Sequence, residues 1–263
     1  GCGNGQLEWR IVGPTLYRYL SRFEIPVELY APYGTPKEEL QLNFLVPNKS
    51  AADTQPAEKE PMPAQRIEPA WVAIVEILRR IEQEPYHWPV GRTTFQKIVF
   101  AATHEGLPTK LQFRRGSYGP FSPDLTKMLS KLVNNGLIRE ERLGRLISIR
   151  VGSTFEDARK IHAEQLVNWE PVIEKAADLF VRLSTGQAEI VATVLFAADE
   201  LSNANGKKPE ENEILDAVMQ WKQRRRPAIE RSEVADTIRN LAALGWLSVQ
   251  ASHDLPVAEE AWL

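Results

Sequence analysis

The chain has 263 residues, of which 43% are hydrophobic and 25% charged, with a net charge of −3. This composition is that of an ordinary globular protein, and it excludes a collagen-like or wholly disordered chain. At this length one to three folded units are expected. A dedicated nucleic-acid binder normally carries a basic domain, so the acidic balance makes DNA or RNA the less favoured partner.

Cysteine and hydropathy define the compartment that the sequence predicts. Cys2 is the single cysteine, so no internal disulfide can form, which fits a reducing cytoplasm. No run of apolar residues is long enough for a membrane helix, and no signal-peptide pattern occurs. We therefore expect a cytoplasmic protein with no membrane partner. Because the sequence begins at Gly1 within a glycine-rich run, we also expect it to be part of a longer protein.

Residues 1–32 predict a loop, a helix and a strand. The helix follows from apolar residues spaced three and four apart between Trp9 and Phe23, and the strand from alternation over residues 25–31. A glycine-rich loop before a helix can bind an anion through free backbone N–H groups, although it equally fits a turn without a ligand. The loop residues are Gly1, Cys2, Gly3, Asn4 and Gly5.

This order of elements resembles the last part of a macrodomain, in which such a loop holds the diphosphate of ADP-ribose. The resemblance implies that residues 1–32 are a C-terminal fragment of a macrodomain, an α/β/α fold. The rest of the sheet and the catalytic residues would then lie upstream. One helix and one strand cannot bury a core alone. We therefore expect no cofactor here, with ADP-ribose bound only by a complete macrodomain.

Residues 33–69 are rich in proline and predict a linker. Residues 70–152 then predict a winged-helix-like unit: a helix at 70–83, a helix capped by Thr93 or Thr94 and ended by Gly106, and a strand at 110–115. The next helix is expected to be capped by Ser122, and strands at 137–141 and 146–151 follow.

Residues 153–263 predict a second helical, winged-helix-like unit. A long helix over about 154–183, either continuous or broken near Pro171, leads to helices near 186–202, 210–224 and 229–244 and to a strand at 246–250. The spacing of Leu125, Leu129 and Leu132 recurs in Val234, Ile238 and Leu241, which suggests an internal repeat. The predicted fold class is mainly α with small β hairpins (α+β), containing two winged-helix-like units preceded by the loop-helix-strand fragment.

The run from Phe95 to Ile138 resembles the C-terminal domain of DarG antitoxins, in which a Gln-Lys helix, a strand and a Tyr-Gly-Pro turn precede another helix. A macrodomain tail followed by this domain is the DarG arrangement. The resemblance implies a module that binds and neutralises DarT, a DNA ADP-ribosyltransferase toxin, by blocking its DNA or NAD cleft. The shared residues are Gln96, Lys97, Phe113, Gly116, Tyr118, Gly119, Pro120 and Gly136.

No residue pattern indicates catalysis or a metal site. The four histidines have no metal-ligand spacing, and no nucleophile elbow, P-loop or complete dinucleotide motif occurs. The expectation is therefore that this chain is not an enzyme, whereas its intact parent would carry macrodomain ADP-ribosylglycohydrolase activity.

Two groups of residues are candidates for binding a protein partner. Arginines beside exposed aromatic side chains suit an interface, although the turn residues could instead only shape the fold. This group comprises Arg114, Arg115, Tyr118 and Phe121. Carboxylates four residues apart would align on one helix face, either as a solvated surface or as a mimic of DNA phosphates. This group comprises Glu170, Glu174 and Asp178.

Two alternatives to the antitoxin module remain. In a winged-helix regulator that represses its own operon, basic side chains would contact DNA, although a solvated polar face explains them equally. The candidates are Lys127, Lys131, Arg224 and Arg225. The other alternative is a part of a DNA ADP-ribosyl hydrolase that positions its substrate.

Overall fold

The computed structural model describes residues 9–22, 27–29, 31, 35–46, 67–144 and 146–256. The chain divides into two compact units, residues 1–65 and residues 66–263. The predicted glycine-rich loop at residues 1–5 lies outside the described residues. No helix among the described residues has both the length and the apolar character that crossing a membrane requires.

The first unit contains α1 (Trp9–Leu20), the 3₁₀ helix η2 (Lys37–Leu40) and α2 (Leu42–Leu45). The indole N–H of Trp9 donates to the backbone oxygen of Glu39 at 3.0 Å, and Arg10 pairs with the Glu39 carboxylate at 2.6 Å. These contacts join α1 to η2, so part of the predicted linker packs against the first helix. In the predicted strand at 25–31, the described residues 27–29 and 31 have no strand structure.

The first half of the second unit contains three helices and two hairpins. Its helices are α3 (Pro69–Gln83), α4 (Arg92–His104) and α5 (Asp124–Asn134). The first hairpin pairs β1 (Arg114–Gly116) with β2 (Gly119–Phe121), and the second pairs β3 (Ile138–Leu143) with β4 (Leu146–Val151). Both hairpins are antiparallel and two-stranded. The predicted fold class, mainly α with small hairpins, is therefore confirmed.

A short bridge adds to the second hairpin. Gly91, just before α4, pairs with Ser148 of β4, and the Ile149 N–H donates to the Val90 oxygen at 2.8 Å. The order predicted for a winged helix was helix, helix, strand, helix and hairpin. The structure has this order, except that the strand expected at 110–115 is the β1–β2 hairpin and the bridge at Gly91 is additional. The winged-helix assignment itself stays a prediction.

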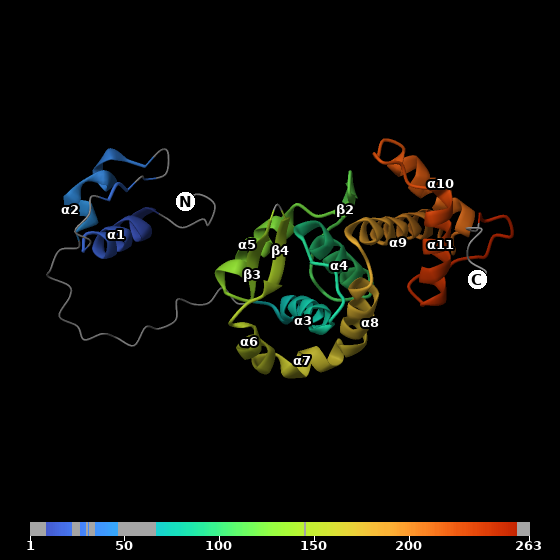
Figure 1. The fold of residues 1–263 in the computed structure, drawn as a ribbon, viewed down its shortest axis with the longest axis horizontal. Coiled ribbons are helices and arrows are strands. Elements are labelled where there is room, and N and C mark those ends of the chain that lie inside the picture. Colours follow the sequence, from blue (N-terminus) through green and yellow to red (C-terminus); the bar gives the residue numbers. More distant parts are fainter. Residues whose placement is uncertain are drawn as a thin grey trace. The chain divides into compact units, whose positions relative to one another are not determined.

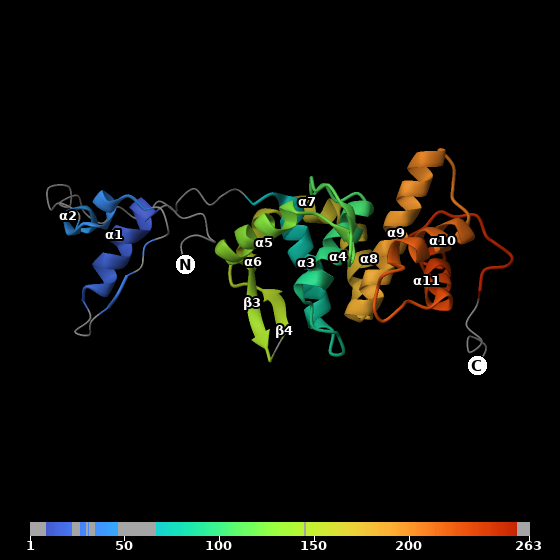
Figure 2. The ribbon, with the colours of Figure 1, turned by 90° about the horizontal axis from the view of Figure 1, so that it is seen from above.

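The second half contains six helices among its described residues. They are α6 (Phe155–Ile161), α7 (Ala163–Asn168), α8 (Glu170–Val181), α9 (Thr185–Asn205), α10 (Glu211–Lys222) and α11 (Arg231–Ala243). Figure 1 shows α6, α7 and α8 following one another in an arc past α3, with α9 leading away to α10 and α11, and Figure 2 shows the same path from above.

Two predictions for this half are wrong. The long helix expected over 154–183 is three helices: the break at Trp169 lies near Pro171, where one was considered, and the break at His162 was not expected. The break at Trp169 has a clear cause, because Pro171 has no N–H for a helix continuing from α7 and is tolerated only in the first turn of α8. The strand expected at 246–250 is reduced to one parallel bridge between Glu210 and Gln250.

One apolar core connects the two halves of this unit. Most of α3 is buried on every side, including Trp71 and Ile74. α8 packs against α3 and α4, α9 packs against α4, and α10 and α11 pack against α9. The core therefore crosses the predicted boundary between residues 152 and 153, and the domain boundaries stay predictions.

Helix ends follow the sequence only in part. Gly106 and Gly136 end α4 and α5 in the left-handed region, at φ +96° and +71°, as glycines after a helix commonly do. Ser122, in contrast, does not cap α5. Its hydroxyl is buried without a hydrogen-bond partner among the described residues, and Gly91 stands at the N-cap of α4 in place of Thr93 or Thr94.

Substitution Gly152→Ala tests the close approach between the start of α6 and the end of α5. A Cβ at residue 152 would overlap the carbonyl oxygen of Gly136, so backbone must move. We expect a loss of about 1–3 kcal/mol in the free energy of unfolding, measured by urea denaturation. The matched control is Gly186→Ala in α9, where the nearest atom lies 4.0 Å from the new Cβ and the helix should gain about 0.5–1 kcal/mol. Equal stability of the two variants would contradict this packing.

Candidate protein-interaction site

The β1–β2 hairpin presents an aromatic side chain to solvent. Tyr118, in the turn, is 71% exposed, whereas Gly119 and Pro120 beside it are buried. Gly119 has φ +86°, and a Cβ there would lie 2.9 Å from the Thr193 hydroxyl oxygen on α9. Only glycine fits both constraints. The turn therefore packs closely on α9 while its tyrosine points away, and Figure 1 shows the hairpin standing beside the start of α9.

Helix α4 anchors the β2 side of the hairpin. The Lys97 ammonium donates to the carbonyl oxygen of Pro120 at 2.9 Å, and the Gln96 amide donates to the same oxygen at 3.4 Å. Lys97 is only 1% exposed. Pro120 contributes no N–H of its own, so its carbonyl is the backbone group that α4 can hold. The Gln-Lys pair and the Tyr-Gly-Pro turn of the sequence motif are thus in direct contact.

Helix α10 anchors the β1 side. The indole N–H of Trp221 donates to the Gly116 oxygen at 3.1 Å, and the Lys222 ammonium donates to the Ser117 oxygen at 2.9 Å. Both donors come from the last turn of α10. Because α4 and α10 hold opposite strands, the hairpin is fixed at both of its sides.

A shared carboxylate balances the buried cations beneath the turn. Glu189 of α9 pairs with Lys222 at 2.8 Å and with Arg225 at 3.4 Å. The pKa of Lys97 is lowered to about 8, first by burial and then by the nearby Lys222 ammonium, while Glu189 opposes both effects. Burial also lowers the pKa of Lys222, whereas the hydrogen bond that Lys222 donates to the Glu189 carboxylate raises it. Cations therefore outnumber carboxylates in this interior.

The predicted residues of the hairpin lie close to one another, but they differ in how free their side chains are to contact a partner. Arg115 pairs with Glu200 at 2.7 Å and stacks over Trp221, with its guanidinium carbon 5.0 Å from the centre of the ring it covers. Its main role is thus to brace β1 against α9 and α10. The exposed Arg114 lies over the ring of Phe121, 6.0 Å from the centroid. Arg114, Tyr118 and Phe121 are thus all exposed on the same hairpin, and we call these three residues the hairpin surface.

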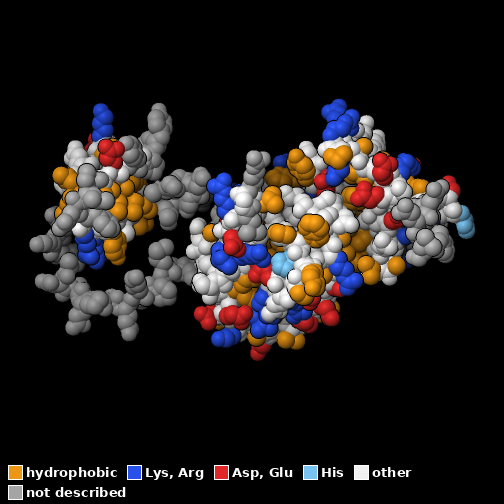
Figure 3. Space-filling model, viewed as in Figure 1, with side chains coloured by type: hydrophobic (Ala, Val, Ile, Leu, Met, Phe, Trp, Pro, Cys, Tyr) orange, Lys and Arg blue, Asp and Glu red, His pale blue; other side chains and the backbone are white. Residues whose placement is uncertain are grey.

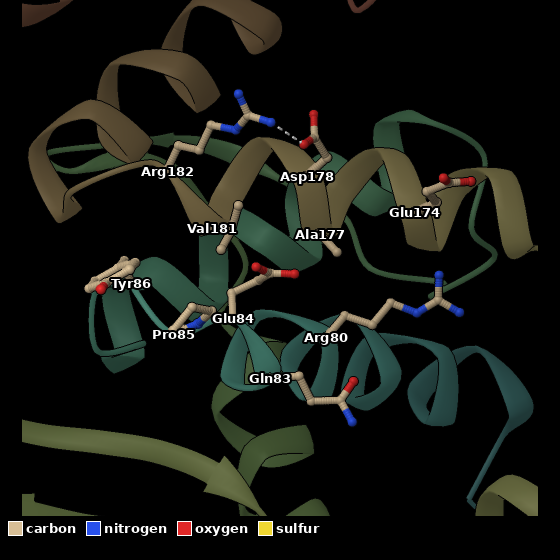
Figure 4. A pocket seen from close by; sticks show the side chains of 10 residues that line it. All are labelled: Arg80, Gln83, Glu84, Pro85, Tyr86, Glu174, Ala177, Asp178, Val181 and Arg182. Atoms are coloured by element: carbon tan, nitrogen blue, oxygen red, sulfur yellow. Dashed lines mark hydrogen bonds and ion pairs between the residues drawn. The ribbon is translucent and has the colours of Figure 1, made fainter.

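The predicted carboxylates occupy another surface. Glu170, Glu174 and Asp178 all lie on α8, as expected, but Glu170 makes a bidentate pair with Arg80 at 2.7 and 2.8 Å. Asp178 pairs with Arg182 at 2.6 Å. Glu174 and Asp178 line a groove between α8 and the end of α3, shown in Figure 4, whereas the hairpin contacts α4, α9 and α10.

The alternative DNA-binding residues are not brought together. Lys127 and Lys131 lie on α5, and Lys127 pairs with Asp124 at 3.3 Å. Arg224 and Arg225 follow α10, where Arg225 is engaged with Glu189. On the face drawn in Figure 3, acidic and basic side chains are interspersed over the lower part of the helical unit.

Sequence reasoning missed Trp221, Lys222 and Glu189, which build the seat of the hairpin. A lysine at the end of a helix usually serves the helix dipole at the surface, so nothing in the sequence marks Lys222 as buried. Metal ligands are not indicated either: within the described part of the chain, no three His, Cys, Asp or Glu side chains could hold a metal ion. A role of residues 1–5 in holding ADP-ribose stays a prediction.

Two characterised proteins are similar to this chain, while no protein-family profile matches it. A DNA ADP-ribosyl transferase–DNA ADP-ribosyl glycohydrolase fusion protein of Thermosipho africanus is 51% identical over 43 residues, 16% of this chain and 11% of that protein. A DNA ADP-ribosyl glycohydrolase of Thermus aquaticus is 29% identical over 133 residues, 50% of this chain and 32% of that protein. The matches thus span less than a third of the glycohydrolase and about a tenth of the fusion protein.

These relatives support a relation to the DarG family, and they correct one expectation. We predicted that the chain is not an enzyme. That prediction is wrong, because the relative that matches half of the chain is a DNA ADP-ribosyl glycohydrolase, which points to an enzyme family. The match covers 32% of that glycohydrolase, so the lack of catalytic motifs in this chain does not exclude the family.

Substitution Lys97→Met tests the buried cation beneath the turn. In the folded protein this pKa is about 8, below its ordinary 10.5, so between these values the unfolded chain binds the additional proton. The contribution of Lys97 to the free energy of unfolding must therefore rise as the pH increases from 8 to 10.5, by up to about 3 kcal/mol. We expect the unfolding free energy of the wild type, relative to Lys97→Met, to increase over this range.

The control is Lys127→Met, which removes an ammonium group from the surface of α5, outside this interior. Lys222 is present in all three proteins, but its ammonium interacts with that of Lys97, so the difference for Lys97→Met reports this buried pair of cations. A flat difference for Lys97→Met would show that its ammonium is not desolvated as described.

Proposed function

We propose that the helical unit, residues 66–263, is the toxin-binding part of a DarG-type antitoxin and neutralises a DarT-like DNA ADP-ribosyltransferase. The observation that carries this proposal is the hairpin surface, where Tyr118 is exposed on a turn held from beneath by Lys97 and Lys222. The relatives support it, since one of them combines a DNA ADP-ribosyl transferase and a DNA ADP-ribosyl glycohydrolase in one chain.

The physical basis is preorganisation. Aromatic and arginine side chains contribute most of the binding free energy at protein interfaces. Affinity is highest when these side chains are already ordered before binding, because less conformational entropy is then lost. Tyr118 has only two side-chain torsions to order, and its backbone is constrained by Gly119 and Pro120. The hairpin would enter the DNA or NAD cleft of the toxin and exclude its substrate by occupying that space.

Steric blocking fits this geometry better than acidic mimicry of DNA. Of the aligned carboxylates on α8, Glu170 and Asp178 are each paired with an arginine, so the charge they present is largely neutralised. The phosphates of DNA, in contrast, are not paired with fixed cations, so these carboxylates imitate them poorly. The hairpin surface, which is basic and aromatic, accordingly carries the main contact in this proposal.

The relation to a glycohydrolase supports a second candidate function. In it, the unit positions ADP-ribosylated DNA for hydrolysis by the whole protein, whose activity would be removal of ADP-ribose from DNA. The Thermus aquaticus relative favours this candidate, because it matches over half of the chain. The two candidates separate in a hydrolysis assay on ADP-ribosylated DNA: only the second requires that hairpin substitutions slow the reaction when no toxin is present.

Substitution Tyr118→Ala tests the toxin-binding proposal. The partner tested is the product of the gene next to that of this chain, which the proposal requires to be a DNA ADP-ribosyltransferase, and its affinity is measured by isothermal titration calorimetry. Because Tyr118 is exposed, folding should be unaffected while binding weakens by about tenfold or more, as for an interface hot spot of 1.4 kcal/mol or above. Ile161→Ala, at an exposed residue of α6, is the matched control and should bind as the wild type. If Tyr118→Ala binds the partner with unchanged affinity, the proposed contact is wrong.

The DNA-binding alternative predicts a different sensitivity. Under that alternative, the doubly substituted Lys127→Gln and Lys131→Gln protein loses binding to duplex DNA in a gel shift, and wild-type binding weakens steeply with salt. We expect no retarded duplex with the wild type at 50 mM salt (a low ionic strength on the scale of phosphate contacts). A retarded band that vanishes in the double variant would favour the regulator over the antitoxin module.

A further inference from the structure

The loop between α3 and α4 exposes two aromatic side chains that the hairpin does not involve. It reads Glu-Pro-Tyr-His-Trp-Pro-Val from Glu84 to Val90. Tyr86 is 94% exposed and Trp88 is 59% exposed. Large aromatic side chains normally bury most of their surface, and exposed ones are typical of contact surfaces. The prolines at 85 and 89 limit the freedom of the loop, so the rings are displayed on a constrained backbone.

A groove adjoins this loop. It lies between the end of α3 and one face of α8 and has a volume of about 480 Å³. Figure 4 shows the Glu84 carboxylate directed into the space between the helices, with Tyr86 towards one end and Glu174 towards the other. Ala177 and Val181 provide an apolar wall on α8. The groove thus combines an aromatic ring, carboxylates and an apolar surface.

The carboxylates of the groove are not all compensated. Arg80 is engaged by Glu76 and Glu170, and Arg182 by Asp178. Glu84 and Glu174 have no ion pair with any described residue. Since the arginines that line the groove already serve other carboxylates, the residual charge of the groove is negative. Phosphate groups would be repelled, and a cationic ligand would be attracted.

We propose that this groove is a docking site for an arginine-bearing segment of a protein partner. One guanidinium stacks on Tyr86 and pairs with Glu84, a second basic side chain reaches Glu174, and an apolar side chain between them packs on Ala177 and Val181. Arginine is favoured over lysine because its planar group stacks on an aromatic ring and matches a carboxylate in two hydrogen bonds. The site shares no residue with the hairpin surface, so it stands or falls separately from the proposed function.

The test uses the full 263-residue chain and three peptides. They are acetyl-Gly-Arg-Leu-Gly-Arg-Gly-amide and the same peptide with both arginines replaced by lysine or by glutamine. Binding is followed by changes in backbone amide NMR signals. We expect the arginine peptide at millimolar concentration to shift signals of Glu84, Tyr86 and Glu174, the lysine peptide to bind more weakly and the glutamine peptide not to bind. No binding of the arginine peptide, or equal binding of the glutamine peptide, overturns the proposal.

Substitutions locate the binding within the groove. Tyr86→Ala and Glu84→Gln, both at exposed positions, should each weaken the arginine peptide by about two- to fivefold, the effect of one exposed cation–π contact or ion pair. Glu164→Gln removes an exposed carboxylate of α7 outside the groove and is the charge-matched control. The same weakening in Glu164→Gln would mean attraction by net charge alone, which also overturns the proposal.

Discussion

Lys97 and Lys222 lie inside the helical unit, and each directs its ammonium group at a carbonyl oxygen of the same hairpin. An unpaired charge is costly to bury, so these groups stay only where the backbone and Glu189 satisfy them. The hairpin in turn has a two-residue turn and short strands that would not be stable alone. Cations and hairpin therefore depend on each other, and the exposed position of Tyr118 follows from that dependence.

The same arrangement connects the two halves of the helical unit. Lys97 comes from α4, in the first predicted winged-helix-like unit, while Glu189 and Lys222 come from α9 and α10 in the second. His104 adds a second connection, since its ring contacts Asp199 at 2.8 Å and the Trp246 oxygen at 3.3 Å. The hairpin surface is thus built on residues from both halves, and neither half alone would display it.

The sequence predicted those features that local patterns determine. Apolar spacing located α3, α9, α10 and α11 within a few residues, and left-handed glycines ended α4 and α5. The Tyr-Gly-Pro turn was also located correctly. Features that depend on distant residues were not predictable: the pairing of Glu170 with Arg80, 90 residues away, and the burial of Lys222 follow from packing alone. The unused hydroxyl of Ser122 shows that a local capping pattern can yield to packing.

Site-specific photo-crosslinking can show whether Tyr118 lies at the contact with the toxin. A photoreactive benzoyl-phenylalanine replaces Tyr118 in one protein and Ile161 of α6 in another, and each is irradiated with the product of the neighbouring gene, which the proposed function requires to be a DNA ADP-ribosyltransferase. We expect position 118 to form a covalent adduct, which mass spectrometry maps to residues of the toxin's DNA or NAD cleft. Position 161 should form none. An adduct from 161 with none from 118, or one mapped away from the cleft, would contradict the proposed contact.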